Sequence, residues 1–92
     1  MPKPVWAPRA RQDLREIILY IAEDSPQTAA IVNERILNAV DLLAKMPKSG
    51  RPGRVPGTRE RVVGRTPFLL IYTFESTQVR ILRVLRGARK WP

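Results

Sequence analysis

Residues 79–92 read VRILRVLRGARKWP and join an expected β-strand to a basic chain end. The β-branched and apolar residues of 79–85 favour a strand that lies against a core. Because side chains alternate along a strand, one face is expected to carry Val79, Ile81, Arg83 and Leu85. A merely solvated outer face would explain the arginines of this strand as well as a binding role does. The tail after Gly87 is basic and ends in Trp91 and Pro92, and since chain ends normally fray, this composition suggests that a partner binds it.

The excess positive charge of the chain lies entirely in its second half. The net charge is +9, yet residues 1–45 hold six basic and six acidic groups, whereas residues 46–92 hold eleven basic and two acidic ones. Such asymmetry predicts an anionic partner, either nucleic acid or an acidic protein segment. Composition alone leaves both open.

Length and composition narrow the class of protein. The 92 residues suffice for one domain with a single core, expected to span residues 1–92. The absence of cysteine and histidine excludes disulfides, thiolate metal sites and the commonest general base. The longest apolar run, residues 17–22, is far shorter than the roughly 20 residues that cross a bilayer, and no signal-peptide pattern is present. We expect a cytoplasmic protein without a metal or cofactor.

A first amphipathic helix is expected over residues 8–23, with Pro8 in its first turn. Its buried stripe is expected to comprise Leu14, Ile17, Ile18 and Ile21. Its polar face, expected to be solvated, carries Arg11, Asp13, Arg15 and Glu16. Tyr20 lies beside the stripe and is expected at the edge of the core.

A second helix is expected over residues 26–46. Ser25 is placed to cap its N-terminus, Pro26 suits its first position, and Pro47 ends it. The apolar residues that recur at helical spacing are Ala29, Val32, Ile36, Val40 and Leu43. Because the connection between the helices is so short, they should form an antiparallel hairpin.

The second half predicts a small antiparallel sheet. Residues 47–57 are rich in proline and glycine and are expected to form an irregular surface loop. Strands are expected over residues 58–65, 68–74 and 79–86, with a brief edge strand over residues 3–6. Short connections join only antiparallel neighbours, and residues 68–72, apolar on both faces, should be central. The expected fold class is α+β, a two-layer fold in which the helical hairpin packs on the sheet.

Segments along the whole chain carry a family resemblance. They are residues 6–10 (WAPRA), 13–14, 17–22 (IILYIA), 43–47, 50–53 (GRPG), 57–60 (GTRE), 67–72 and 81–92. In their order and spacing they resemble the ParE branch of the RelE/ParE superfamily, the bacterial toxins of type II toxin–antitoxin and plasmid-stabilisation systems. The resemblance implies a helical hairpin on a small antiparallel sheet, as the periodicity predicts independently.

The resemblance leaves two activities to choose between. ParE-type toxins trap DNA gyrase on broken DNA and block replication, whereas RelE-type toxins are ribosome-dependent endoribonucleases that cleave mRNA. Metal-free RNA cleavage needs groups that take and return protons, and this chain has no histidine and no tyrosine in its C-terminal segment. Residues 68–69 are apolar, whereas the ribonuclease branch has an arginine-bearing motif at the similar position of the middle strand. Glu60 is a candidate base, but it belongs to a Thr-Arg-Glu pattern that is typical of the ParE branch.

We therefore expect a gyrase-inhibiting toxin that is not an enzyme and has no catalytic residue. A RelE-type ribonuclease remains the alternative. A plain nucleic-acid-binding module, which is supported by charge alone, remains a second one. The chain also departs from the family pattern at one notable position. ParE-like sequences commonly end in a segment similar to Leu-His-Gly-Ala-Arg-Gln-Trp, and Arg86 takes the place of its histidine. This arginine keeps a donor and a cationic contact but removes a titratable group.

The resemblance further implies a partner, an acidic ParD-like antitoxin. Such antitoxins carry an N-terminal DNA-binding domain through which the hetero-oligomer binds its own operator, and an acidic amphipathic segment that wraps the toxin. We expect an apolar groove beside the helical hairpin to receive the helix of the antitoxin, while basic residues pair with its carboxylates. The basic residues expected to contact the antitoxin are Arg61, Arg65 and Arg80.

The toxic surface is expected at the chain end. Its candidate residues are Arg83, Arg86, Arg89, Lys90 and Trp91, with Arg59 as a second-rank candidate. Arginine can bind phosphate or carboxylate through two parallel hydrogen bonds, and tryptophan supplies a large apolar anchor. Trp91 could instead fold back onto the sheet and pack there.

Overall fold

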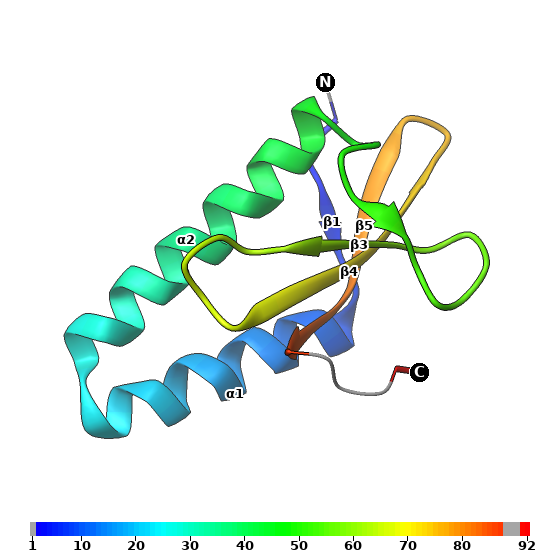
Figure 1. Cartoon of the computed structure of the whole chain (residues 1–92). Coiled ribbons are helices and arrows are strands. Elements are labelled where there is room, and N and C mark those ends of the chain that lie inside the picture. The colour runs from blue at the N-terminus through cyan, green and yellow to red at the C-terminus, as the bar shows by residue number, and fades with distance from the viewer. Residues whose placement is uncertain (1, 88–90) are drawn as a thin grey trace.

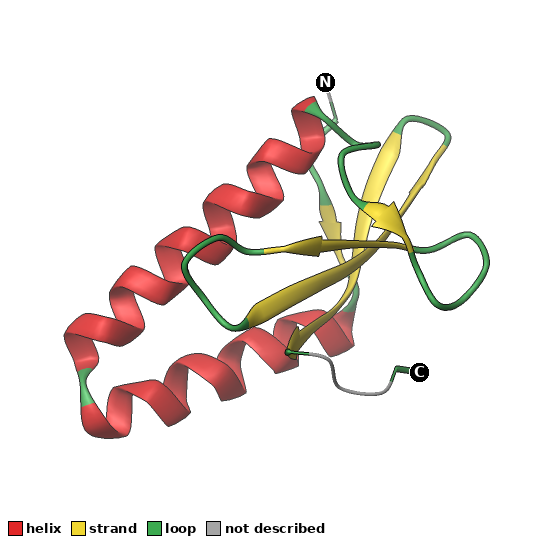
Figure 2. Cartoon of the chain, viewed as in Figure 1, coloured by secondary structure: helices red, strands yellow, loops and turns green. Residues whose placement is uncertain are grey.

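A computed structural model describes residues 2–87 and 91–92 of the chain. The elements follow in the order β1 (Val5–Trp6), α1 (Pro8–Asp24), α2 (Pro26–Lys45), β2 (Arg51–Pro52), β3 (Arg59–Val62), β4 (Phe68–Glu75) and β5 (Gln78–Arg86). Figure 1 shows α1 and α2 diverging from one tight bend, and Figure 2 shows the strands gathered on one side of them. The α+β fold with a helical hairpin on a sheet is confirmed. No helix of the described part is long and apolar enough to cross a membrane.

The sheet has the strand order β1-β5-β4-β3-β2. β1 runs parallel to β5 at one edge, and the other neighbours are antiparallel. The predicted antiparallel meander with a central strand at residues 68–72 is therefore confirmed, as is the short edge strand near the N-terminus. β2 lies inside the segment expected to be an irregular loop, so that expectation is wrong at Arg51 and Pro52. These two residues pair with β3 although their composition gives no strand signal.

Ser25 joins the two helices and satisfies backbone groups on both. Its amide donates to the carbonyl of Ile21 at 2.9 Å, which ends α1, and its Oγ accepts from the Thr28 amide at 3.1 Å, which starts α2. A serine at this position with Pro26 behind it is the expected helix start. A single connecting residue forces the two helices into the antiparallel hairpin that the sequence predicts.

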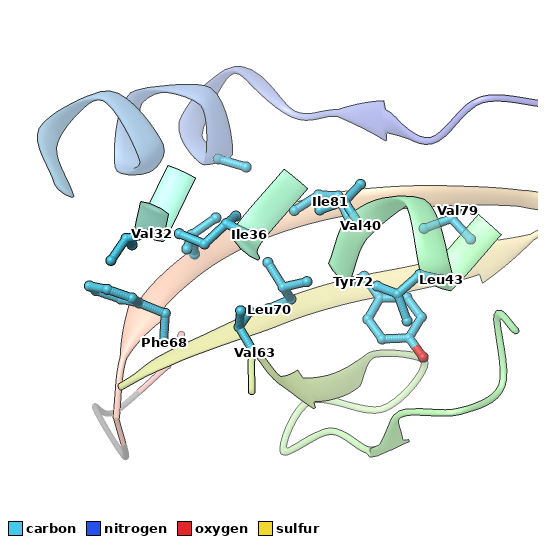
Figure 3. Close-up of a cluster of buried hydrophobic side chains, with 12 residues drawn as sticks. Val32, Ile36, Val40, Leu43, Val63, Phe68, Leu70, Tyr72, Val79 and Ile81 are labelled. Carbon is cyan, nitrogen blue, oxygen red and sulfur yellow. The ribbon is translucent and has the colours of Figure 1, made fainter. Parts of the chain in front are cut away.

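The main core lies between the hairpin and the inner face of the sheet, as Figure 3 shows. α2 contributes Val32, Ile36, Val40 and Leu43, and the strands contribute Leu70, Tyr72, Val79, Ile81 and Val84. The apolar stripe predicted for α2 is thus the one that is buried. Tyr20, by contrast, is 69% exposed, so its expected place at the core edge is wrong. The stripe predicted for α1 packs against this core but is only half-buried, and the buried residues of α1 are Ala10 and Asp13.

β5 departs from strict alternation at one residue. Ile71 pairs with Arg83 and Tyr72 pairs with Ile81, so Leu82 is an extra residue in the ladder, a β-bulge. The expected common face of Val79, Ile81, Arg83 and Leu85 is therefore wrong beyond Ile81. Val84 joins the inner core, and Leu85 lies in a cluster on the outer face. Without the bulge, strict alternation would point the charged side chain of Arg83 into the core. Because burying an unpaired charge destabilises a fold, the bulge removes this destabilisation.

Candidate functional site

Asp13 and Arg83 form a partly buried ion pair between α1 and β5. Arg83 Nε donates to Asp13 Oδ2 at 2.7 Å, and Arg83 Nη2 donates to Asp13 Oδ1 at 3.1 Å. The amide of Val84 donates to the same carboxylate at 2.9 Å. β1 pairs with β5 only at Arg80 and Ile81, so Asp13 supplies the acceptor that a longer β1 would have offered to Val84. The carboxylate therefore continues the edge of the sheet where β1 stops.

The environment of Asp13 favours its charged form. Burial by itself raises the pKa of Asp13, but hydrogen bonds from the Arg83 side chain and the Val84 amide outweigh it and hold the pKa below the ordinary value. The hydrogen bond to Asp13 also raises the pKa of Arg83. Asp13 is 6% exposed, so the expectation that it is solvated is wrong. Asp13 lies three residues after buried Ala10 and four before Ile17, a spacing that could have placed it on the inner stripe.

Arg59 fastens the segment that follows α2. Its Nη1 donates to the carbonyl of Gly50 at 2.9 Å and to that of Lys48 at 3.4 Å. Tyr72 acts beside it, because its hydroxyl donates to the carbonyl of Pro47 at 2.8 Å and accepts from the Gly50 amide at 2.9 Å. Arg59 thus has a structural task that the sequence did not indicate. Its expected contact with the target stays a prediction.

The outer face of the sheet carries a cleft of about 340 Å³. Its floor includes Leu69 and Ile71, which form a buried cluster with Leu85, and Trp91 packs against that cluster. Trp91 therefore folds back onto the sheet, which is one of the two positions that the sequence left open. The basic rim of the cleft is formed by Arg51 and Arg54.

Glu60 lies in this outer cleft and is held by the rim. Its Oε1 accepts from Arg51 Nη2 at 3.1 Å, and its Oε2 accepts from the Arg54 amide at 3.3 Å. A carboxylate with both oxygens occupied by such donors is a neutralised structural group, although it could still act as a base if a substrate displaced them. Among the described residues no cluster of acids could hold a metal ion.

A second hollow of about 650 Å³ runs along the helical hairpin. α1 lines it with Leu14, Ile18, Leu19 and Ala22, and α2 with Ala29, Ala30, Asn33 and Leu37. The small alanines of α2 leave room there, and Leu19 is exposed. Arg11 and Arg15 stand at its border. An apolar groove bordered by basic residues suits an amphipathic helix with acidic flanks.

The other candidate residues are spread over the sheet. Arg86 is exposed at the end of β5, opposite Phe68. Arg80 is exposed and lies between Val5 and Thr73 in the sheet. Arg61 is half-buried on β3, and Arg65 is exposed in the turn that follows, with a φ of 59°. Arg89 and Lys90 lie outside the described residues, so Trp91 and Pro92 are the part of the tail after Gly87 that the structure describes.

Comparisons with known proteins agree along nearly the whole chain. The family model described as "ParE toxin of type II toxin-antitoxin system, parDE" matches residues 5–91. "Putative toxin Y4kP" of Sinorhizobium fredii is 46% identical over 87 residues, which cover 95% of this chain and 90% of the relative. "Toxin RelE1" of Caulobacter vibrioides is 28% identical over 81 residues, which cover 86% of each chain. A structure titled "Chromosomal ParDE TA system from P. aeruginosa" matches with a TM-score of 0.82 and 29% identity, covering 95% of this chain and 97% of that one.

Proposed function

The chain belongs to the ParE toxin family of type II toxin–antitoxin systems, and from this premise we propose that it inhibits DNA gyrase and is neutralised by a ParD-like antitoxin. The observation that carries the choice of activity is the chemistry of the outer cleft. Its one carboxylate, Glu60, is bound to Arg51 and to the Arg54 amide, and the chain has no histidine. A binding mode of action needs no proton-transfer group, so these residues favour a poison over a ribonuclease.

The chain end is the proposed target surface. Arg86 is exposed, and Trp91 rests on the outer cluster of Leu69, Ile71 and Leu85 rather than in the main core. A half-buried tryptophan beside exposed arginines is the kind of anchor that dominates protein interfaces. Arg89 and Lys90 are included from the sequence. Arg83 is also included, although its guanidinium is bound to Asp13, so we expect it to act through the position of β5.

The groove along the hairpin is the proposed antitoxin surface. Its apolar lining from both helices and the arginines at its border fit an acidic amphipathic helix. The related P. aeruginosa structure is titled as a ParDE system, which supports an antitoxin partner. We further propose that the complex binds its operator through the antitoxin and acts in the cytoplasm, where gyrase works.

The gyrase proposal is tested with purified gyrase, relaxed plasmid and the isolated protein. We expect supercoiling to fall and double-strand breaks to accumulate, and both effects to disappear when antitoxin is added. Truncation after Gly87 should abolish the effect, whereas Arg15→Gln, on the far helical hairpin, should leave it intact. A truncated chain that folds and still poisons gyrase would show that the tail is not the working surface.

The ribonuclease alternative retains one supporting observation, the position of Glu60 beside two arginines and Trp91 in one cleft. If gyrase is indifferent to the protein, the same sample should be added to translating ribosomes. Cleavage of mRNA that is lost in Glu60→Gln would then make the ribonuclease the leading function.

The antitoxin surface is tested by filling the groove. Ala30 lines the groove and is exposed, so Ala30→Glu should place a carboxylate against an acidic partner without disturbing the core. We expect the antitoxin encoded beside the toxin gene to copurify with the wild type and not with this variant. Asn38→Glu is the matched control, because Asn38 is exposed on α2 but does not line the groove.

A further inference from the structure

The buried carboxylate of Asp13 binds a second arginine besides Arg83. Arg9, one turn earlier on α1, donates from its Nε to Asp13 Oδ1 at 3.3 Å, and Arg83 Nη2 donates to the same oxygen at 3.1 Å. The two arginines differ in exposure, since the side chain of Arg9 is 60% exposed and that of Arg83 is 21% exposed. Two guanidinium groups thus share one carboxylate, and the outer one faces solvent.

The position of Arg9 on the helix does not favour stability. Asp13 already accepts two bonds from Arg83 and one from the Val84 amide. Arg9 lies in the first turn of α1, which holds no acidic residue, and the positive end of the helix dipole disfavours a cation there. An arginine four residues before an aspartate is also the less favourable order of such a pair on a helix. These facts favour a role for Arg9 other than holding the fold.

The guanidinium of Arg9 can bind an anion while it stays in place. Its Nε makes the bond to Asp13, and within residues 2–87 and 91–92 its two Nη groups donate to no acceptor. Two Nη groups side by side are the arrangement that binds a carboxylate through parallel hydrogen bonds. Because Asp13 already fixes the other side of the guanidinium, less side-chain freedom is lost on binding.

Asp13 also joins Arg9 to the end of β5. Its Oδ2 accepts from the Val84 amide at 2.9 Å, and the exposed Arg86 follows two residues later. Figure 1 shows the end of β5 beside the first half of α1, and the two elements are in contact. Arg9 therefore lies next to the strand that leads into the proposed target surface.

The charges around Asp13 suit a single carboxylate better than a nucleic acid. Glu16, one turn after Asp13, also acts on Arg83 through its charge. Arg9, Arg83 and Arg86 thus face two acidic residues, which leaves only a small positive excess. A nucleic acid presents a dense row of phosphates and needs several free cations, whereas one carboxylate needs one guanidinium.

We propose that Arg9 extends the target surface from β5 onto α1 and binds a carboxylate in an acidic segment of the target protein. The identity of this protein rests on the proposed function, which names gyrase. The Nη groups of Arg9 bind the carboxylate, and Asp13 is a positioning residue that holds Arg9 beside Arg83. The sequence did not indicate Arg9, because it lies on the first helix, far along the chain from the basic tail.

The concentration that halves gyrase supercoiling tests the role of Arg9. We expect Arg9→Gln to raise it about fivefold, and Arg9→Lys, which keeps the charge but not the two parallel donors, about threefold. Lys45→Gln removes one exposed charge at the end of α2 and should change it by less than about 1.5-fold. Equal inhibition by Arg9→Gln and the wild type would overturn the proposal.

Urea unfolding separates this role from a structural one. Because the Arg9 side chain is mostly exposed, Arg9→Gln should keep the urea midpoint of the wild type. A midpoint as low as that of Asp13→Asn would show that Arg9 holds the fold, and the proposal would fail.

Plasmid DNA without gyrase shows whether the bound anion is a phosphate instead. We expect the wild type and Arg9→Gln to retain plasmid equally in native gels. If Arg9→Gln weakened retention of DNA as much as it weakens inhibition of gyrase, the partner would be a nucleic acid and the carboxylate would be rejected.

A peptide keeps the test distinct from the gyrase proposal. If the wild type leaves gyrase untouched, the gyrase proposal fails, and blocked tetraglutamate then tests Arg9 alone, with tetralysine as the control of opposite charge. The NMR signal of the Arg83 Nε–H group reports binding beside Arg9. We expect the dissociation constant read from this signal to be about threefold higher in Arg9→Gln than in the wild type. Equal constants, or no shift of the signal with tetraglutamate, would refute the role of Arg9.

Discussion

The two faces of the sheet bury their residues in different ways. The inner face packs against both helices and holds the large core that includes Ile36, Leu70 and Tyr72. The outer face buries a small cluster of Leu69, Ile71 and Leu85, partly covered by Leu82 and Trp91. Because β4 alternates between the faces, adjacent residues of one strand belong to both.

This difference separates stability from interaction. Residues of the inner face are buried against the helices, so substitutions there should lower the stability of the fold and not act on a binding surface. The outer cleft and the groove of the hairpin remain open, and arginines line both: Arg51 and Arg54 in the cleft, Arg11 and Arg15 in the groove. The excess positive charge of the second half lies outside the main core, whose buried residues are apolar.

Leu70→Ala and Leu69→Ala test the comparison most directly. Leu70 is 0% exposed in the inner core and Leu69 is 9% exposed in the outer cluster. We expect Leu70→Ala to lower the free energy of unfolding by about 4 kcal/mol and Leu69→Ala by about 2 kcal/mol, since the inner cavity cannot collapse. Urea unfolding of both variants measures the difference. Equal losses would mean that the outer cluster is as tightly packed as the core.

Asp13→Asn should produce the next largest effect. The substitution keeps the shape but removes the charge that faces Arg83 and weakens the acceptor of the Val84 amide. Because Arg83 is 21% exposed and can regain some water, we expect a loss of about 2–3 kcal/mol, below the range for a fully buried pair. Asp24→Asn, at the exposed end of the same helix, should change stability by less than about 0.5 kcal/mol. Similar losses in the two variants would refute the structural role of Asp13.

The same ion pair predicts a loss of stability in acid. The pKa of Asp13 is lower in the folded state than in the unfolded state, where it is about 3.9. Its contribution is therefore fully present above about pH 4 and is lost as the pH falls through the lower folded pKa. Urea midpoints at several pH values should show the gap between wild type and Asp13→Asn narrowing below pH 4, whereas a constant gap would contradict this linkage.

The sequence predicted what depends on periodicity and missed what depends on single contacts. The stripe of α2 and the cap at Ser25 follow from spacing and local chemistry, so both were predictable. The bulge at Leu82 was not, because it depends on how Arg83 meets Asp13 seventy residues away. The turn at Ser76 and Thr77 has positive φ at both residues, although turns of this kind usually carry Asn-Gly. Among candidate site residues, Arg59 shows the same limit, since no sequence pattern reveals its bonds to the carbonyls of Lys48 and Gly50.

Arg51→Gln should have the smallest effect, and it sharpens the comparison through a second ion pair. Arg51 binds Glu60 at 3.1 Å on the outer side, but its side chain is 69% exposed, so water and salt screen the attraction. We expect a loss of about 0.5 kcal/mol and, in a double-mutant cycle with Glu60→Gln, a coupling energy below about 1 kcal/mol. Arg54→Gln is the control, because Arg54 reaches Glu60 through its backbone amide, which the substitution keeps. A coupling energy as large as the loss in Asp13→Asn would place this pair among the contacts that hold the fold, and the outer cleft would then be less free to open for a partner than its exposure suggests.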